Sequence, residues 1–141
     1  MSELAALAPT ALRRWSARGA AIFCLAFAVF QLSLALGAPL GQIAWGGSSA
    51  VLPDDLRWTS VGACLYLLVA AAIMEVRAGD IGRGLPRLPF VIFNVLLAAQ
   101  LLLNTLANLA TRTAGERYGM GAASALGSVL CLLALKPMRK P

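Results

Sequence analysis

Four long stretches of the chain contain no charged residue, and each is bounded by charged or helix-breaking positions. The first follows Arg18 and reads GAAIFCLAFAVFQLSLALG, ending at Gly37. The other three run from Arg57 to Glu75, from Arg87 to Arg112 and from Arg117 to Lys136. A helix needs about 20 apolar residues to cross a hydrocarbon layer of roughly 30 Å. We therefore predict an all-α fold, an integral membrane bundle of four transmembrane helices at about 19–37, 58–74, 89–110 and 118–135.

The flanks of these spans leave no room for a soluble module, so we expect one transmembrane domain over residues 19–136. Residues 1–18 are predicted to form an amphipathic cytoplasmic or interfacial stretch, with Leu4, Leu7, Leu12 and Trp15 as its apolar positions. Residues 137–141 form a basic cytoplasmic tail. The first span also has the basic flank of a signal peptide. Its apolar stretch exceeds the usual length of about 7–15 residues, which favours a retained helix.

Polar residues enter the spans mainly in the third. At about 100° per residue, Gln100, Asn104 and Asn108 share a helical face with Asn94. Gln31 in the first span lies at the same depth as Gln100. Amides facing lipid have no partners, so this face is predicted to point into the outer half of the bundle. Two interpretations stay open: hydrogen bonds between helices, each contributing about 0.6 kcal/mol, or a hydrated cavity that binds a ligand.

The two loops predicted on the outer side carry most of the other polar residues. Trp45 fits an interfacial anchor, and Pro53-Asp54-Asp55 is typical of a helix start. Ion pairs between the two aspartates of the first loop and the arginines of the second would hold the loops together. The functional hypothesis is an outer mouth for an anionic or amphipathic ligand. The cluster comprises Trp45, Asp54, Asp55, Arg57, Arg112, Glu116 and Arg117.

Small residues recur at i, i+4 spacing in the fourth span, at Gly119, Ala123, Gly127 and Cys131. Such a stripe lets another helix approach closely. We predict that it packs against a helix of the same chain or of a second copy.

Composition excludes a soluble globular protein, because 60% of the 141 residues are hydrophobic and only 13% are charged. The net charge of +6 lies in short clusters beside the spans, which indicates a lipid bilayer as partner and not a nucleic acid. Nine of the twelve basic residues fall on one side of the predicted spans, which places both termini in the cytoplasm. They are Arg13, Arg14, Arg18, Arg77, Arg83, Arg87, Lys136, Arg139 and Lys140.

Catalytic chemistry finds little support. The chain has no histidine, so candidate nucleophiles such as Ser60, Cys64 and Ser128 lack the commonest activating base. The cysteines form no C-x-x-C pair. We therefore expect no catalytic residues, no metal site and no cofactor.

Several short motifs resemble a family of small bacterial integral membrane proteins with four transmembrane helices and no assigned function. In the first outer loop they are GAPLG (37–41), WGG (45–47) and LPDDLR (52–57). NTLANL (104–109) and GER (115–117) resemble the family's third helix and following loop. The resemblance implies four spans in a bacterial cytoplasmic (inner) membrane and implies no activity.

Two functions remain. One is a non-catalytic membrane component, an accessory or interaction subunit, which requires only helix association. The alternative is a small-molecule or lipid binding or transport unit whose polar site comprises Gln31, Gln100, Asn104 and Asn108. A chain this short would need a homodimer or a larger membrane complex to form a pathway.

Overall fold

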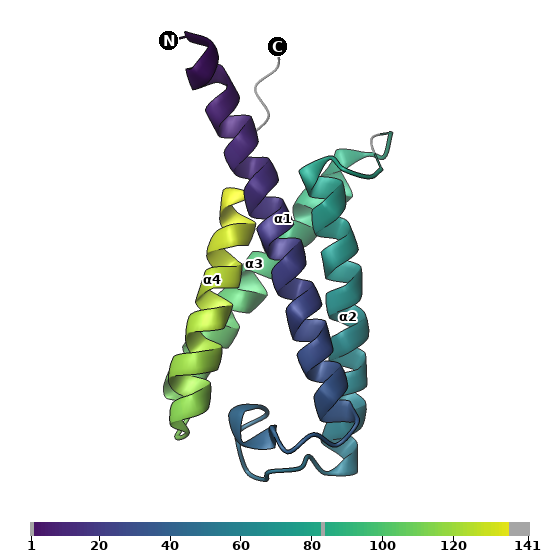
Figure 1. The fold of residues 1–141 in the computed structure, drawn as a ribbon, viewed down its shortest axis with the longest axis vertical. Coiled ribbons are helices and arrows are strands. Elements are labelled where there is room, and N and C mark those ends of the chain that lie inside the picture. Colours follow the sequence, from purple (N-terminus) through teal and green to yellow (C-terminus); the bar gives the residue numbers. More distant parts are fainter. Residues whose placement is uncertain (1, 83, 136–141) are drawn as a thin grey trace.

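The computed structural model of the chain describes residues 2–82 and 84–135, with side chains from residue 11 onward. Within these residues the fold is all-α, as predicted (Figure 1). The long helices are α1 (Ser2–Ala35), α2 (Asp54–Ala78) and α3 (Arg87–Ala110). The short helix η1 (Gly41–Ile43) lies in the loop between α1 and α2. The π-helix η2 (Gly115–Met120) and α4 (Gly121–Leu133) follow α3.

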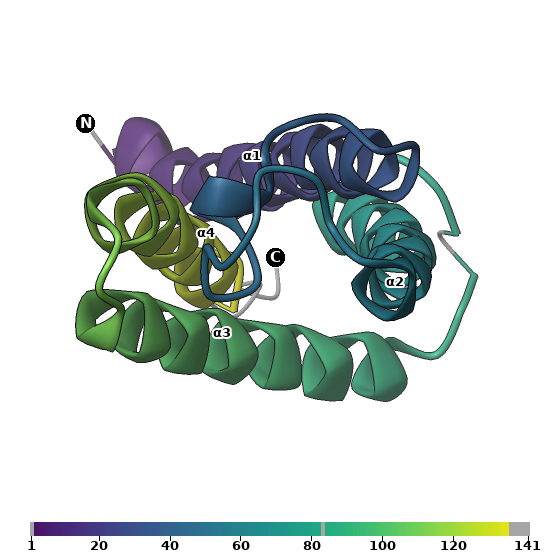
Figure 2. The ribbon, with the colours of Figure 1, turned by 90° about the horizontal axis from the view of Figure 1, so that it is seen from below.

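The helices pack as two pairs, α1 with α2 and α3 with α4. The pairs cross near the end that holds Arg14, Arg18 and Asp80, here called the arginine end. They separate toward the opposite end, here called the loop end, where the loop between α1 and α2 lies across the opening (Figure 2). The core at the crossing consists mostly of small side chains, which let helices approach closely. Its buried members are Ala17, Ala20, Ala21, Cys24, Ala70, Ala71, Met74, Ala78, Leu97, Ala98, Leu101, Cys131 and Ala134.

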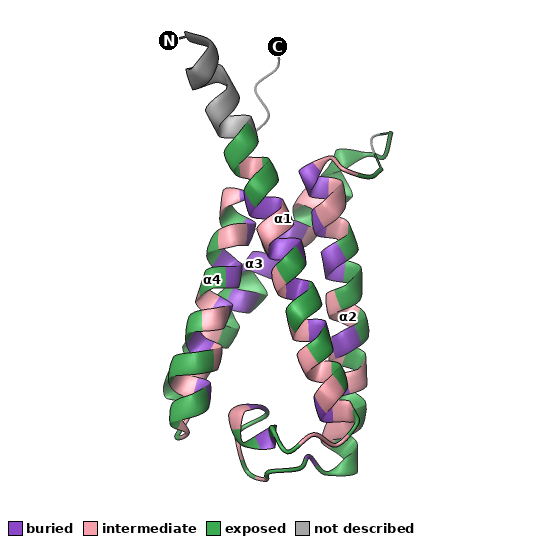
Figure 3. Cartoon of the chain, in the orientation of Figure 1, coloured by how far each residue is buried: buried purple, intermediate pink, exposed green. Residues whose placement is uncertain are grey.

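Many helix positions are exposed (Figure 3). Large apolar side chains occupy many of these exposed positions. Among the residues that the structure describes, three helical segments are long and apolar enough to cross a membrane, Ala11–Ala35, Asp54–Ala78 and Arg87–Ala110. Their mean hydropathies are 1.7, 1.9 and 2.0. A soluble protein would bury such residues, whereas a bilayer accepts them on the surface. The predicted membrane class is supported on these grounds.

Helices α1, α2 and α3 begin before the predicted uncharged spans, and α2 also ends beyond its span, because charges limit an apolar run but not a helix. Helices α1 and α4 end at Ala35 and Leu133, before the predicted ends at 37 and 135. Pro53 and Pro86 precede the first residues of α2 and α3, where a fixed φ and a missing N–H do no harm. The predicted helix start at Pro53-Asp54-Asp55 is confirmed. Gly79, at φ +83°, ends α2, and its N–H donates to the carbonyls of Glu75 and Val76.

Helix α1 shows no break at residue 18, where a separate amphipathic stretch was predicted to end. The helix runs from Ser2 to Ala35, and Ser16 and Ala17 are already buried. Alanine, leucine and arginine on both sides of the expected boundary favour continuous helix. The side chains of Leu4 and Leu7, the connector residue Arg83, and the basic tail 137–141 lie outside the described residues.

The predicted small-residue stripe divides at η2. Gly127 is buried, and a Cβ there would lie 2.7 Å from the ring of Phe23 on α1. Gly119 is exposed, with no atom within 4 Å of such a Cβ, and Ala123 is half-buried. The i→i+5 hydrogen bonds of a π-helix add a residue per turn and rotate the helix face. Gly119 therefore meets no other helix within the described residues, and packing of this part of the stripe against a second copy stays a prediction.

Three arginines each donate a hydrogen bond to a carbonyl at the C-terminal end of a helix, where cations are favoured. The bonds are Arg57 Nε to Ala35 O at 2.8 Å, Arg77 Nη2 to Ala134 O at 2.8 Å, and Arg117 Nη2 to Thr111 O at 2.6 Å. The ends of α1, α4 and α3 are thereby satisfied by side chains.

Candidate functional site

The helix pairs separate at the loop end (Figure 2). Residues of both pairs and of the loop between α1 and α2 line a cavity of about 440 Å³ there. Its volume lies within the range of small-molecule sites, roughly 300–1,000 Å³. The structure brings all four predicted amides to this cavity, Gln31 from α1 and Gln100, Asn104 and Asn108 from α3. Asn94, on the same face of α3, lies nearer the crossing. It is fully buried and does not line the cavity.

The side chains of these amides make few hydrogen bonds with one another or with neighbouring helices. Gln100 Oε1 accepts a hydrogen bond from Tyr66 Oη on α2 at 2.7 Å. Among the described residues, the side chains of Asn104 and Asn108 have no hydrogen-bond partner. Gln31 Oε1 is buried and likewise unpartnered within that part of the chain. The cavity therefore offers donors and acceptors that a bound molecule can use.

Aromatic side chains line the cavity together with the amides. Phe23 and Phe27 from α1 line the cavity with ring centroids 4.5 Å apart, and Tyr66 adds a third ring from α2. These residues were not predicted as part of the site, because a phenylalanine in an apolar run resembles a lipid-facing residue. The available signal is the spacing of Phe23, Phe27 and Gln31, which places all three on one face of the helix.

The loop between α1 and α2 reaches the cavity through a strained turn. Trp45, Gly46 and Gly47 all have positive φ, at +53°, +88° and +65°. A Cβ on Gly47 would lie 2.7 Å from Thr113, so only glycine fits this close approach. The turn directs the indole N–H of Trp45 to Ser60 Oγ on α2 at 3.0 Å. It also turns the backbone N–H of Gly46 toward η2.

Glu116 on η2 receives that N–H. Its Oε1 accepts from Gly46 N at 2.7 Å and its Oε2 accepts from Thr113 Oγ1 at 3.1 Å. The side chain is only 2% exposed and lines the cavity. It is the one charged side chain among the described residues that line this cavity.

The predicted outer-loop cluster does not form as a unit. The expected ion pairs between the aspartates of the first loop and the arginines of the second are wrong within the described residues. Asp54 is exposed and pairs with Arg57 at 3.7 Å, and Arg117 turns to the end of α3. Asp55 and Arg112 are exposed and do not line the cavity. Only Trp45 and Glu116 of the cluster line it. The loops are joined by a carboxylate and a backbone N–H, a pairing that side-chain patterns do not reveal.

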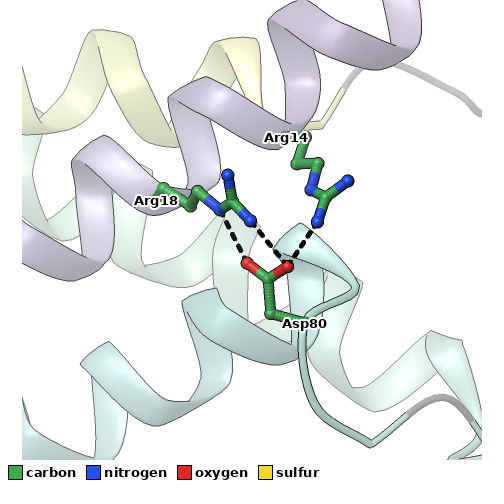
Figure 4. A network of polar contacts seen from close by, with 3 residues as sticks. All are labelled: Arg14, Arg18 and Asp80. Carbon is green, nitrogen blue, oxygen red and sulfur yellow. Dashed lines mark hydrogen bonds and ion pairs between the residues drawn. The ribbon is translucent and has the colours of Figure 1, made fainter.

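A second polar network lies at the arginine end (Figure 4). Arg18 donates two hydrogen bonds to the Asp80 carboxylate, from Nε at 2.7 Å and from Nη2 at 2.8 Å. Arg14 donates a third, from Nη2 at 2.7 Å. The hydrogen bonds from Arg18, and then that from Arg14, hold the pKa of Asp80 well below its usual range. The sequence signal was available, since Asp80 lies in a connector predicted on the same side as these arginines.

No protein-family model, no curated protein and no solved structure matches this chain. The resemblance to small bacterial membrane proteins therefore stays a prediction. Function is therefore inferred from the polar residues at the loop end and at the arginine end of the molecule.

Proposed function

We propose that the protein binds a small uncharged or cationic amphipathic molecule in the cavity at its loop end. The observation that carries this proposal is the meeting of the four amides with Glu116 in one concave space. Side chains that merely join helices would bond to one another. Among the described residues, a single hydrogen bond joins one of these amides to another helix, and in it Tyr66 Oη donates to Gln100 Oε1.

The lining defines the chemistry of the ligand. Aromatic rings favour an apolar or cationic group, and the amides favour neutral hydrogen-bonding groups. Glu116 contributes negative charge, while Arg57, Arg112 and Arg117 are absent from the lining. An anionic ligand, which was one option in the sequence analysis, is therefore disfavoured.

We also propose four spans, with the arginine end in the cytoplasm of a bacterial cell and the cavity facing outward. The six residues of η2 and the 13 of α4 follow without interruption, which gives a helical segment of roughly 28 Å. Positive charge at the cytoplasmic side supports the direction. Arg13, Arg14, Arg18, Arg77 and Arg87 all lie at the arginine end.

Native mass spectrometry of the protein released from detergent tests the cavity, since it reports oligomeric state and any co-purified mass. The added probes are benzyltrimethylammonium, a cation, and benzenesulfonate, an anion of similar size. We expect the cation to bind and the anion not to bind. Asn104→Ala should weaken binding of the cation about tenfold, as should Glu116→Gln, since each removes one polar contact.

Gln42→Ala is the matched control, because Gln42 in η1 is an exposed amide that does not line the cavity. Absence of a bound mass and of probe binding would overturn the proposal. It would return the non-catalytic accessory subunit as the better prediction.

Cysteine labelling with a membrane-impermeant maleimide tests the direction of the helices. Ser48 at the loop end and Ile81 at the arginine end are exposed, and the native cysteines are buried. Ser48→Cys should react in intact cells, whereas Ile81→Cys should react only after the cells are opened. The reverse pattern contradicts the proposed orientation.

A further inference from the structure

A second cavity, of about 300 Å³, lies at the arginine end between α1, α2 and the start of α3. Three arginines line it, Arg13 from α1, Arg77 from α2 and Arg87 from α3. None of the described residues in its lining is acidic. The rest of the lining is apolar apart from two glycines, with Val76, Ile81, Leu85 and Phe90.

Two of these arginines, Arg13 and Arg77, have unused hydrogen-bonding capacity. Arg77 is only 8% exposed, and within the described residues its side chain donates one hydrogen bond, from Nη2 to the carbonyl of Ala134. Within the described residues, the Nε atoms of Arg77 and Arg13 are buried and without a partner. Arg13 and Arg87 also repel Arg77 electrostatically. A buried guanidinium surrounded by like charges is unfavourable unless an anion compensates it.

The acidic groups nearby do not supply that compensation. Asp80 is engaged by Arg14 and Arg18, and neither Asp80 nor Glu75 lines the cavity. The first turn of α3 adds a further positive feature. Arg87 and Phe90 of that turn line the cavity, and its N-terminus has no side-chain cap. Uncapped N–H groups at a helix N-terminus favour anions.

We propose that this cavity binds a phosphate group, carried by the headgroup of an anionic phospholipid. Arginine guanidinium groups match phosphate oxygens in charge and geometry. The exposed side chains of Ile81 and Leu85 offer an apolar surface for the start of an acyl chain. Basic pockets between transmembrane helices on the cytoplasmic side are suited to such headgroups. The site lies at the opposite end from the proposed ligand cavity and does not depend on it.

The test uses the full-length protein in a non-ionic detergent, with lipids added during native mass spectrometry. The probes are dioleoylphosphatidylglycerol, which is anionic, and dioleoylphosphatidylcholine, which is zwitterionic and has the same acyl chains. We expect at least about tenfold tighter binding of the anionic lipid. Arg13→Gln should remove about tenfold of that affinity by deleting one charged contact, and Arg87→Gln should act similarly.

Arg112→Gln is the matched control, since Arg112 is an exposed arginine at the loop end. Arg77 is left unchanged, because it also satisfies the end of α4. Equal binding of the two lipids, or equal losses in Arg13→Gln and Arg112→Gln, would overturn the proposal. Thermal stabilisation by millimolar inorganic phosphate without preference for phosphatidylglycerol would assign the cavity to free phosphate, and would also overturn the lipid assignment.

Discussion

The two ends of the molecule use the same helices to opposite effect. At the arginine end the helix pairs cross through alanine and cysteine, and the ionic network of Asp80 ties α1 to the end of α2. At the loop end the facing positions include aromatic and amide side chains besides leucine and alanine, and the pairs stand apart around a cavity. Side-chain size at the contact thus decides where the bundle closes and where it opens.

The polar groups of the two ends differ as well. Among the described residues, the cavity at the loop end is lined by neutral amides and one buried carboxylate. The cavity at the arginine end is lined by guanidinium groups and by no acidic side chain of that part of the chain. One fold thereby presents a neutral-to-negative site on one side and a positive site on the other.

Gly127→Val should give the largest effect, because Gly127 lies where the closed and open regions meet. The new side chain would displace the Phe23 ring from α4. We expect the free energy of unfolding to fall by about 1–3 kcal/mol, measured by chemical denaturation in detergent. Gly119→Val, at an open position, should change it by less than about 1 kcal/mol. Equal losses in the two variants would show that size at the crossing does not set the closed region.

Asp80→Asn should lower the melting temperature less than Gly127→Val, by weakening the ionic network at the arginine end. Because the pKa of Asp80 is lower in the folded protein, its stabilisation is complete above the ordinary aspartate pKa of about 3.9. It is lost as the pH falls toward the folded value. The difference in melting temperature between the protein and this variant should therefore narrow below about pH 4. Asp54→Asn serves as control, since Asp54 is 94% exposed. A difference that stays constant with pH would contradict the ionic role.

Asn94→Leu should give the smallest effect and the opposite sign. Asn94 is fully buried near the crossing, and within the described residues both polar atoms of its amide lack a partner. Replacing an unsatisfied amide by an apolar group of similar shape should raise the free energy of unfolding by up to about 1 kcal/mol. A loss of stability in a thermal melt would mean that the amide holds a buried partner, and that the closed region has a polar requirement of its own.

Much of the fold could be predicted from the chain, because a membrane imposes long uncharged runs that are visible in the sequence. The helix starts at Pro53 and the convergence of the amides on α3 follow from local rules of this kind. The π-helix at η2 was invisible, since its extra residue per turn leaves no pattern in residue type. Gly127 and Cys131 of the predicted stripe are buried on α4, whereas Gly119, which lies within η2, is exposed.

The site was predictable in its amides and not in its charges. Gln31 and Gln100 stood out because polar residues are rare in apolar runs. Glu116 was placed among loop residues on the surface, and its burial depends on the backbone N–H of Gly46, far away in sequence. Likewise, Arg117 was expected to meet an aspartate of the first loop but donates a hydrogen bond to the Thr111 carbonyl at the end of α3. Which partner a long charged side chain selects depends on backbone geometry that only the folded chain supplies.

The position of Asp80 has a consequence for the order in which the protein is made. Its ion pairs with Arg14 and Arg18 join residues that all precede α3. The α1–α2 hairpin is therefore stabilised by ion pairs that do not involve α3 or α4. Chains are synthesised from the N-terminus, and early units can fold first. The first hairpin can thus be held together in the bilayer before the second exists. The loop-end cavity, which needs α3 and Glu116, is completed only by the last part of the chain to arrive.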